Sequence, residues 1–395
     1  MKEGRIMSNL INPPRILILA TTASMIEQFN MHNIMILKSL GVKVHVGTNF
    51  EEPGNITQKK SSEFRQKLEK MDVTCHQVDF LRGVGNHKQN KKALVEVISV
   101  IKENKISGIH AHSPLGGIIG RRAAHKTNTK IIYTTHGFQF FKHGRIRDWL
   151  LFFPVELFYS KWTDAIITIN KQDYDCAKHM FAKRQYYIPG VGTDILDSLS
   201  TSDESKESLR KEVRAKLGIA DDEYLIISVG ELNNNKNHET VIKAISKLNN
   251  PKIKYVIAGI GKKRKQLTSL IQQLGLSSQI KLLGYQDDLN GLYYAADLNA
   301  FISKREGLGL GGLDGVARGV YIIGTMNTGM ADYIVNNDIG ILIDDPVNVQ
   351  EVSDAINISM HRKHNKKSLE FLKKFDYSFV DKTMQDIYRK EFLGQ

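Results

Sequence analysis

Residues 298–324 read LNAFISKREGLGLGGLDGVARGVYIIG, and this stretch indicates the fold of the chain. An apolar run typical of a buried strand leads into a glycine-rich segment, then into a short helical pattern that Gly319 can end, and a second apolar run begins at Val320. A glycine-rich turn between a strand and a helix exposes backbone N–H groups and the positive end of the helix dipole, which together bind phosphate. The stretch therefore predicts a strand–helix–strand unit with an anion site at its turn.

Strand and helix patterns alternate along most of the remaining chain. In the first half, strand patterns and helical patterns follow one another at residues 15–20, 25–40, 42–47, 93–104, 108–112, 116–126, 130–135, 149–160 and 165–170. In the second half, strand patterns recur at residues 224–229, 254–259, 280–283, 298–303, 320–324 and 340–343. Between the halves, residues 197–207 are polar and serine-rich without an apolar period, which predicts a linker or a domain boundary near here. We therefore expect an α/β protein with two doubly wound, Rossmann-like units that face each other across a cleft.

Composition narrows the class of protein. The chain has 395 residues, of which 41% are hydrophobic, and this is enough for two domains of ordinary size. It has two cysteines and no run of eighteen apolar residues, so we expect neither a disulfide framework nor a membrane span. The first fourteen residues lack the apolar core of a signal peptide. A net charge of +13 favours a polyanionic partner, such as a nucleic acid, an anionic lipid surface or a diphosphate.

Two acids flank the predicted anion site, Glu306 and Asp314, with seven residues between them. Carboxylates beside a phosphate are unfavourable unless the ligand also carries hydroxyl groups. A carboxylate can accept hydrogen bonds from such groups, and a nucleotide-sugar has them. The segment resembles the E-x7-E motif of retaining glycosyltransferases of family 4, which have the GT-B fold. The resemblance implies that Glu306 lies beside the donor sugar, that the glycine-rich backbone holds the diphosphate and that Asp314 binds the ribose. The chain departs from the family pattern where Gly309 replaces a proline and Asp314 a glutamate; the alternative is a purely structural turn.

A second segment, SVGELNNNKNH at residues 228–238, also follows a strand and precedes a helix. It is similar to the G-E-L-N-x-N-K-N-H form found in a subset of bacterial capsule and exopolysaccharide transferases. The resemblance implies that Lys236 grips the donor diphosphate. Glu231 stands where an arginine is usual, and Lys304 or Arg305 could supply the missing cation. The alternative is that Lys236 is a solvated loop lysine.

The segment IIYTTHGFQF at residues 131–140 ends a predicted strand with a His-Gly pair. It resembles the T-x-H-G-F-H-F-Y-K-G segment of the same transferases, with Gln139 in place of the second histidine, and implies that His136 contacts the acceptor or the transferred sugar. Gly137 leaves room for a substrate to approach; the alternative is a structural histidine. His110 and His112 could bind a metal, but no third ligand stands out. Residues 20–25 lack the glycines of a nicotinamide site.

The resemblance covers all but about the first dozen residues and implies a complete site. We expect His136, Lys236 and Glu306 to be catalytic, and His112, His136 and Gly137 to bind the acceptor. The residues expected to bind the donor are Gly230, Asn235, Lys236, Arg305, Glu306, Gly307, Leu308, Gly309, Leu310, Gly311 and Asp314. Lys236 and the backbone at residues 309–312 would stabilise the leaving diphosphate, so we expect neither a metal nor another cofactor.

The same resemblance implies a domain plan and a substrate class. We expect a flexible tail at residues 1–14, an acceptor domain at 15–195, a donor domain at 196–375, and a helix at 376–395 that packs back on the first domain. The expected function is transfer of a sugar, with retention, from a nucleotide-sugar, by resemblance a UDP-sugar, to a lipid-linked glycan in capsule or exopolysaccharide synthesis. A sugar-nucleotide epimerase of the same fold and a basic nucleic-acid-binding protein are the alternatives.

Basic residues gather in the first half, ahead of an apolar stretch that begins at Trp149. A polyprenyl diphosphate acceptor is anionic and membrane-held, so we expect a cytoplasmic protein that docks peripherally on the inner face of the cell membrane. The alternatives are a solvated basic surface and a buried helix. The basic residues concerned are Lys88, Lys91, Lys92, Arg121, Arg122, Lys126, Lys142, Arg145 and Arg147.

Overall fold

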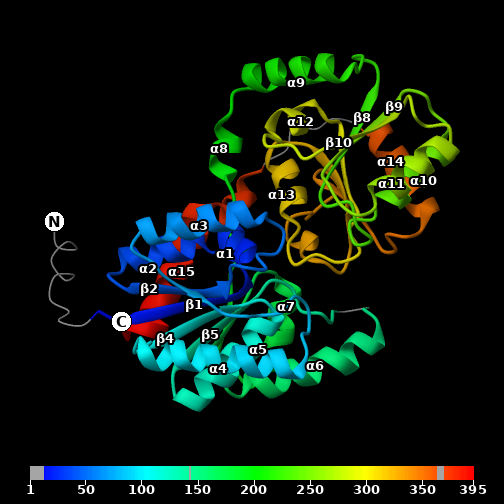
Figure 1. Ribbon diagram of the computed structural model, residues 1–395. Helices are drawn as coiled ribbons and strands as arrows, with labels where there is room; N and C mark the ends of the chain where they lie inside the picture. The colour runs from blue at the N-terminus through cyan, green and yellow to red at the C-terminus, as the bar shows by residue number, and fades with distance from the viewer. Residues whose placement is uncertain (1–12, 142–143, 363–368) are drawn as a thin grey trace. The chain divides into compact units, whose positions relative to one another are not determined.

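The structure is a computed structural model, and it describes residues 13–141, 144–362 and 369–395. Its elements alternate between strand and helix from β1 to α14 (Figure 1). Residues 1–12, which make up most of the expected tail, lie outside the described residues, as does Lys142. The chain forms two compact units, which we call the first unit (residues 1–192 and 378–395) and the second unit (residues 193–377).

The first unit is a seven-stranded sheet in the order β3-β2-β1-β4-β5-β6-β7, with every pairing parallel. Helices α1, α2 and α3 lie on one face of the sheet, and α4 and α5 lie on the other (Figure 1). Its strands are β1 (Arg15–Thr22), β2 (Lys43–Asn49), β3 (Thr74–Gln77), β4 (Gly108–His112), β5 (Lys130–Thr135), β6 (Ala165–Thr168) and β7 (Arg184–Tyr187). Its helices are α1 (Ala23–Phe29), α2 (Met31–Ser39), α3 (Gln58–Lys70), α4 (His87–Glu103), α5 (Pro114–Thr127), α6 (Ile146–Ser160), α7 (Lys171–Ala177), α15 (Tyr377–Tyr388) and the π-helical η4 (Arg389–Leu393).

The second unit repeats this design with six parallel strands in the order β10-β9-β8-β11-β12-β13. Its strands are β8 (Tyr224–Val229), β9 (Ile253–Ala258), β10 (Ile280–Gly284), β11 (Leu298–Phe301), β12 (Tyr321–Thr325) and β13 (Gly340–Ile343). Its helices are α8 (Ile195–Ser200), α9 (Asp203–Leu217), α10 (His238–Leu248), α11 (Arg264–Gln273), α12 (Asn290–Ala295), α13 (Leu310–Ala317), α14 (Val349–His361) and the 3-10 helices η2 (Gly329–Asp332) and η3 (Glu370–Phe375). The expected pair of doubly wound α/β units is thus confirmed.

Both sheets are covered on two faces, which explains their sequences. Apolar strands such as Ile16–Leu19 are buried along their whole length, because helices pack on either side. In each unit the strand order reverses once, between β1 and β4 in the first unit and between β8 and β11 in the second. Loops that leave the carboxyl ends of strands at such a reversal diverge to opposite faces and leave room for ligands.

The single helix expected at residues 25–40 is wrong, because the structure breaks it into α1 and α2 at Asn30. Asn30 leaves the helical conformation, with φ −123° and ψ 1°, and its backbone N–H still donates to the carbonyl of Ile26. The buried amide of Asn30 donates to the carbonyl of Met25 and accepts from Asn33. Asparagine side chains compete with the backbone in this way, which the apolar period does not reveal.

The division between the two units lies at residues 192 and 193, close to the expected linker or domain boundary, but residues 197–207 are not an irregular linker, because α8 and α9 cover almost all of this segment. The hydroxyl of Ser202 caps α9 by accepting from the N–H of Ser205 at 3.2 Å. Arginines rather than apolar side chains hold α9 on the unit: Arg210 donates to Asp297 at 2.7 Å, and buried Arg214 donates to the carbonyl of Ala295 at 3.1 Å. A helix that packs through arginines shows no apolar period.

The end of the chain is anchored in the first unit by polar contacts. Tyr388 on α15 shares a hydrogen bond of 2.6 Å with Nδ1 of buried His110 on β4. Glu391 is 1% exposed and accepts hydrogen bonds from Arg184 at 2.5 Å and from the hydroxyl of Tyr186 at 2.6 Å. Its backbone carbonyl accepts from Lys130 at 3.1 Å. Strand β4 therefore contacts α15, and strands β5 and β7 contact η4.

Buried histidines lie on the strands of the first sheet. His110 hydrogen-bonds to Tyr388 and, through Nε2, to Thr134 at 2.7 Å, and burial lowers its pKa to about 3. His45 and His76 stack on each other with Nδ1 and Nε2 at 2.9 Å, and burial lowers the pKa of His45 to about 4. These imidazoles are therefore neutral in the folded protein at pH 7.

Replacing Glu391 by alanine should lower the free energy of unfolding of the first unit by about 2–4 kcal/mol, because Arg184 and Tyr186 lose a buried, charged acceptor. Urea denaturation measures the change. The matched control is Asp386→Ala, one turn earlier on α15, whose carboxylate is exposed and lies 4.0 Å from Arg389. We expect that variant to change stability by less than about 0.5 kcal/mol. Equal effects of the two substitutions would show that Glu391 is no anchor.

The first unit should lose stability as the pH falls from about 7.5 to 5.5. The unfolded chain binds protons on its histidines near pH 6.5, whereas His45 and His110 remain neutral in the fold, so acid favours unfolding. Each such histidine should cost about 1.4 kcal/mol over this range. Urea denaturation at the two pH values measures the difference, and His110→Gln should reduce it by one histidine's share. A stability that is level or rises toward pH 5.5 would contradict the assignment.

Candidate active site

The predicted anion site forms at the amino end of α13, in the second unit. Gly309 precedes the helix in the left-handed conformation, with φ 84°, and no side chain caps the helix. Tyr333 donates to the carbonyl of Gly309 at 3.1 Å and Tyr293 to that of Gly311 at 2.8 Å, which fixes the backbone of the turn. A Cβ atom on Gly312 would lie 2.3 Å from the Tyr333 hydroxyl, so a side chain does not fit there. The first turn of α13 therefore offers N–H groups to an anion.

Lys236 and Glu306 meet beside this turn, although seventy residues separate them. The Lys236 ammonium lies 2.6 Å from Oε1 of Glu306 and 4.5 Å from the centre of the Phe301 ring. Both side chains are partly accessible, with 20% and 15% of their surfaces exposed. Lys236 follows β8 and Glu306 follows β11, the two strands at which the order of the sheet reverses. The pair thus lies at the position where doubly wound sheets bind ligands.

Asn235 joins the two loops through its backbone and its side chain. Its amide donates to the carbonyl of Arg305 at 2.9 Å, and its own carbonyl accepts from the N–H of Lys304 at 2.8 Å. The side chain of Asn233 accepts from the N–H groups of Asn235 and Lys236, both at 2.9 Å, and so closes the loop on itself. The asparagine-rich segment is therefore a rigid support for Lys236.

Asp314 lies one turn into α13 and is half-buried. Burial raises the pKa of its carboxyl group, and the hydroxyl of Thr193 counteracts this by donating to Oδ1 at 2.8 Å. Thr193 is the first residue of the second unit, and its backbone pairs with Phe375 and Tyr377, where the chain returns to the first unit. The sequence gives no sign of this contact, because only the fold brings residue 193 to residue 314.

In the first unit, the histidines of the two predicted strand ends lie together. Nδ1 of His112 and Nε2 of His136 are 3.1 Å apart, and the His136 ring lies 5.4 Å from that of Phe29. His112 is 1% exposed, so it contacts His136, and its direct contact with an acceptor stays a prediction. Burial lowers the pKa of His136 to about 4, so the imidazole is neutral at pH 7 and can exchange hydrogen bonds with a hydroxyl group. Gly137 follows with φ 119°, a conformation that favours glycine.

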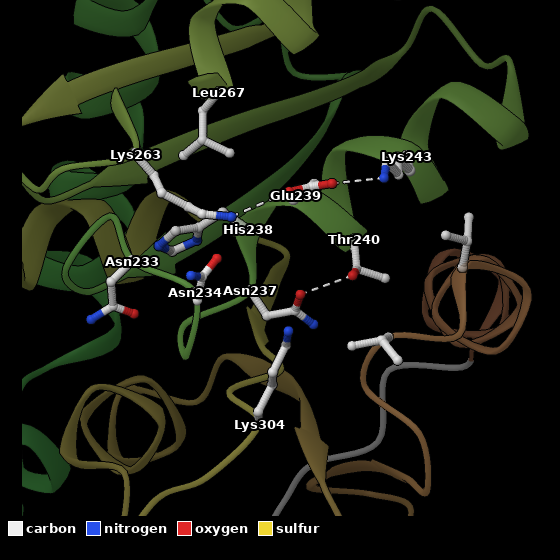
Figure 2. Close-up of a pocket in the computed structure, with 12 residues that line it drawn as sticks. Asn233, Asn234, Asn237, His238, Glu239, Thr240, Lys243, Lys263, Leu267 and Lys304 are labelled. Atoms are coloured by element: carbon white, nitrogen blue, oxygen red, sulfur yellow. Dashed lines mark hydrogen bonds and ion pairs between the residues drawn. The ribbon is translucent and has the colours of Figure 1, made fainter. Parts of the chain in front are cut away.

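A polar cavity of about 210 Å³ lies at the start of α10, and Figure 2 shows its side chains. Lys304 lines this cavity together with Lys243 and Lys263, whose ammonium groups lie 2.7 and 3.4 Å from Glu239. Glu231, which stands where an arginine is usual, is exposed. Compensation of Glu231 by Lys304 or Arg305 stays a prediction.

Helix α6 has an apolar face that the rest of the unit leaves uncovered. Its other face, with Trp149 and Phe153, packs on the core, whereas Ile146, Leu150 and Phe158 are exposed. The buried-helix interpretation is therefore wrong for this outer face. Among the basic residues expected at the surface, Lys88, Lys91, Lys126, Arg145 and Arg147 are exposed.

Arg121 is a correction to that surface, because its side chain is fully buried. Its guanidinium lies 2.8 Å from Glu156 and 4.3 Å from the centre of the Tyr133 ring. Arg121 lies on the buried side of α5. The prediction of a surface cation considered only the charge of the segment and not the helical period.

Metal ligands and membrane-spanning helices can be assessed for the described residues, 13–141, 144–362 and 369–395. They contain no group of three or more histidine, cysteine, aspartate or glutamate side chains that could hold a metal ion. None of the helices in this part of the chain has both the length and the apolar character to cross a bilayer.

Comparison with known proteins gives consistent matches over both units. Residues 36–188 match the family described as Glycosyltransferase Family 4, and residues 210–375 match Glycosyl transferases group 1. The chain is 30% identical over 336 residues to the putative glycosyltransferase EpsD of Bacillus subtilis, which covers 83% of each protein. It is 27% identical over 154 residues, 38% of each protein, to the UDP-Gal:alpha-D-GlcNAc-diphosphoundecaprenol alpha-1,3-galactosyltransferase of Escherichia coli.

A solved structure confirms the architecture. The crystal structure of HepE from Anabaena, in complex with UDP and glucose, superposes with a TM-score of 0.67 at 19% sequence identity, over 96% of this chain and 95% of that one. At this identity the likeness concerns the fold, which is GT-B. The match to EpsD over most of both chains, together with the two family matches, shows that this protein is a glycosyltransferase that belongs to family 4.

Proposed function

We propose that this glycosyltransferase moves a sugar from a UDP-sugar to a lipid-linked glycan, with retention at the anomeric carbon, in capsule or exopolysaccharide synthesis. The observation that carries the proposal is the contact of Lys236 with Glu306 beside the uncapped turn of α13. A cation and backbone N–H groups suit the diphosphate of the donor, and a carboxylate next to them suits a sugar hydroxyl.

The two side chains compensate each other while no donor is bound. When the diphosphate binds, Lys236 turns its ammonium to a phosphate oxygen, and Glu306 becomes free to accept a hydrogen bond from the sugar. The bond between the anomeric carbon and the diphosphate oxygen then breaks, and its electron pair stays on that oxygen. Lys236 and the N–H groups of α13 stabilise the charge that develops there, so no metal ion is required.

The acceptor hydroxyl attacks the anomeric carbon from the face that the diphosphate leaves, which retains the configuration. Its proton passes to the departing phosphate oxygen. His136, neutral at pH 7, positions the transferred sugar or the acceptor through a hydrogen bond. Asp314 would hold the ribose with Thr193 as its support.

Donor and acceptor classes rest on the relatives. HepE binds UDP and glucose, and the Escherichia coli relative is named for a UDP-linked galactose and a diphosphoundecaprenol-linked acceptor. An acceptor of that kind is anionic and held in a membrane. The uncovered apolar face of α6, next to exposed Arg145 and Arg147, supports peripheral docking of the first unit on an anionic cytoplasmic membrane face.

Glu306→Gln and Lys236→Ala should each lower turnover by at least about tenfold, because each removes a charge from the donor site. Release of UDP in the presence of donor and acceptor measures turnover. The matched control is Glu212→Gln, an exposed carboxylate on α9 of the same unit, which should stay within about twofold of wild type. Wild-type turnover of both folded variants would remove the assignment of the pair.

Vesicles that contain anionic lipid should sediment the protein at low salt and release it at 0.5 M salt, because each basic residue near such a surface contributes about 1 kcal/mol and salt screens it. The double variant Arg145→Glu/Arg147→Glu should bind at least about tenfold more weakly. Lys262→Glu/Lys265→Glu changes the net charge equally in the second unit and is the control. No binding at low salt, or equal losses in the two variants, would count against docking through α6.

A further inference from the structure

A cavity of about 360 Å³ opens in the first unit between the amino end of α5 and helix α6. Its volume is typical of a site for a small ligand or part of a larger one. Among the described residues that line the cavity, the one charged side chain is that of Glu156. It is paired with buried Arg121 at 2.8 Å, so the cavity presents no uncompensated charge to a ligand. Most of the side chains that line it are apolar, namely Val84, Pro114, Leu115, Ile118, Phe138, Leu151, Phe152 and Val155.

The wall of the cavity includes neighbours of a predicted acceptor residue, His136. Thr135, Gly137 and Phe138 line the cavity on either side of His136 in the chain. A ligand that filled the cavity would therefore lie next to the His136 loop. This position is different from that of the polar cavity at α10, which lies in the second unit.

The rim of the cavity remains apolar where it meets solvent. Val84 and Leu151 line the cavity, yet 77% and 57% of their surfaces are exposed. Exposed arginines at positions 145 and 147 begin the same helix, and exposed Lys88 and Lys91 follow Val84 in the chain. An apolar rim with cations in the adjoining segments complements a ligand that joins a hydrocarbon chain to an anionic group.

We propose that this cavity binds the hydrocarbon segment next to the diphosphate of the lipid-linked acceptor. The inference rests on the proposed function for the nature of the acceptor and adds where its chain lies. Binding there would draw the first part of the chain out of the bilayer and hold the glycan end at His136. It would also make affinity depend on the chain, because each buried methylene group strengthens binding by about fourfold.

Isothermal titration of the full-length protein with farnesyl diphosphate, geranyl diphosphate and inorganic diphosphate tests the inference. Farnesyl diphosphate should bind at least about thirtyfold more tightly than inorganic diphosphate, with geranyl diphosphate between them. Leu151→Asp puts a charge at the rim and should weaken farnesyl diphosphate at least about tenfold while leaving inorganic diphosphate within about twofold. Val155→Phe fills the cavity without adding charge and should have the same effect on the two affinities. It replaces Leu151→Asp as the test if that variant unfolds.

Leu150→Asp is the matched control, because Leu150 is the neighbouring residue of α6, is 72% exposed and does not line the cavity. Its affinity for farnesyl diphosphate should stay within about twofold of wild type. Equal losses at Leu150 and Leu151, or equal affinity for all three ligands, would overturn the inference. The inference would also be overturned if the ligand-free protein were a dimer that Leu151→Asp dissociates, because the rim of the cavity would then be a contact between two copies of the chain.

The readout needs neither donor nor turnover, so the two proposals fail separately. Titration with UDP in excess occupies the proposed donor site and keeps the diphosphate of the probe out of it. Normal turnover of Glu306→Gln would remove the proposed donor site and leave the cavity result intact, whereas loss of chain-dependent binding would remove the cavity alone.

Discussion

The reversal of strand order between β8 and β11 is the constraint on which the second unit depends. Two neighbouring parallel strands send their chains to opposite faces of the sheet at this point, and the loops after β8 and β11 leave the same edge of the sheet side by side. Lys236 and Glu306 lie there, and their ion pair of 2.6 Å joins segments that are seventy residues apart. The buried strands on either side leave these loops little freedom to separate.

The ion pair also explains how a site for an anion can tolerate acids. A half-buried carboxylate or ammonium group is costly without a partner, and each of these two compensates the other until a ligand replaces the contact. In the proposed function, Glu306 then accepts hydrogen bonds from hydroxyl groups and Lys236 contacts phosphate. Thr193 likewise compensates Asp314. Burial raises the pKa of the Asp314 carboxyl group, and the Thr193 hydroxyl counteracts this by donating a hydrogen bond to it.

The first unit uses neutral groups where the second uses charges. His110, His112 and His136 lie in or beside β4 and β5, and burial lowers the pKa of each. Tyr388 and Glu391, near the end of the chain, hydrogen-bond to residues of β4 and β7. The last helices therefore anchor the sheet whose strand β5 leads to His136. On its outer side, α6 leaves apolar residues exposed beside an apolar cavity, a combination that suits a partner with a hydrocarbon chain.

The sequence by itself determined the α/β alternation and the glycine-rich turn at Gly309, because apolar period and glycine placement are local properties, whereas the roles expected of Lys236 and Glu306 came from the resemblance to the family. It did not reveal α9, on which Arg210 and Arg214 replace apolar contacts, and it counted Arg121 as a surface cation. Only the tertiary structure decided these points, and only it brought Thr193 to Asp314 and His112 to His136. Such contacts depend on strand order and on pairing between distant residues, which no local pattern encodes.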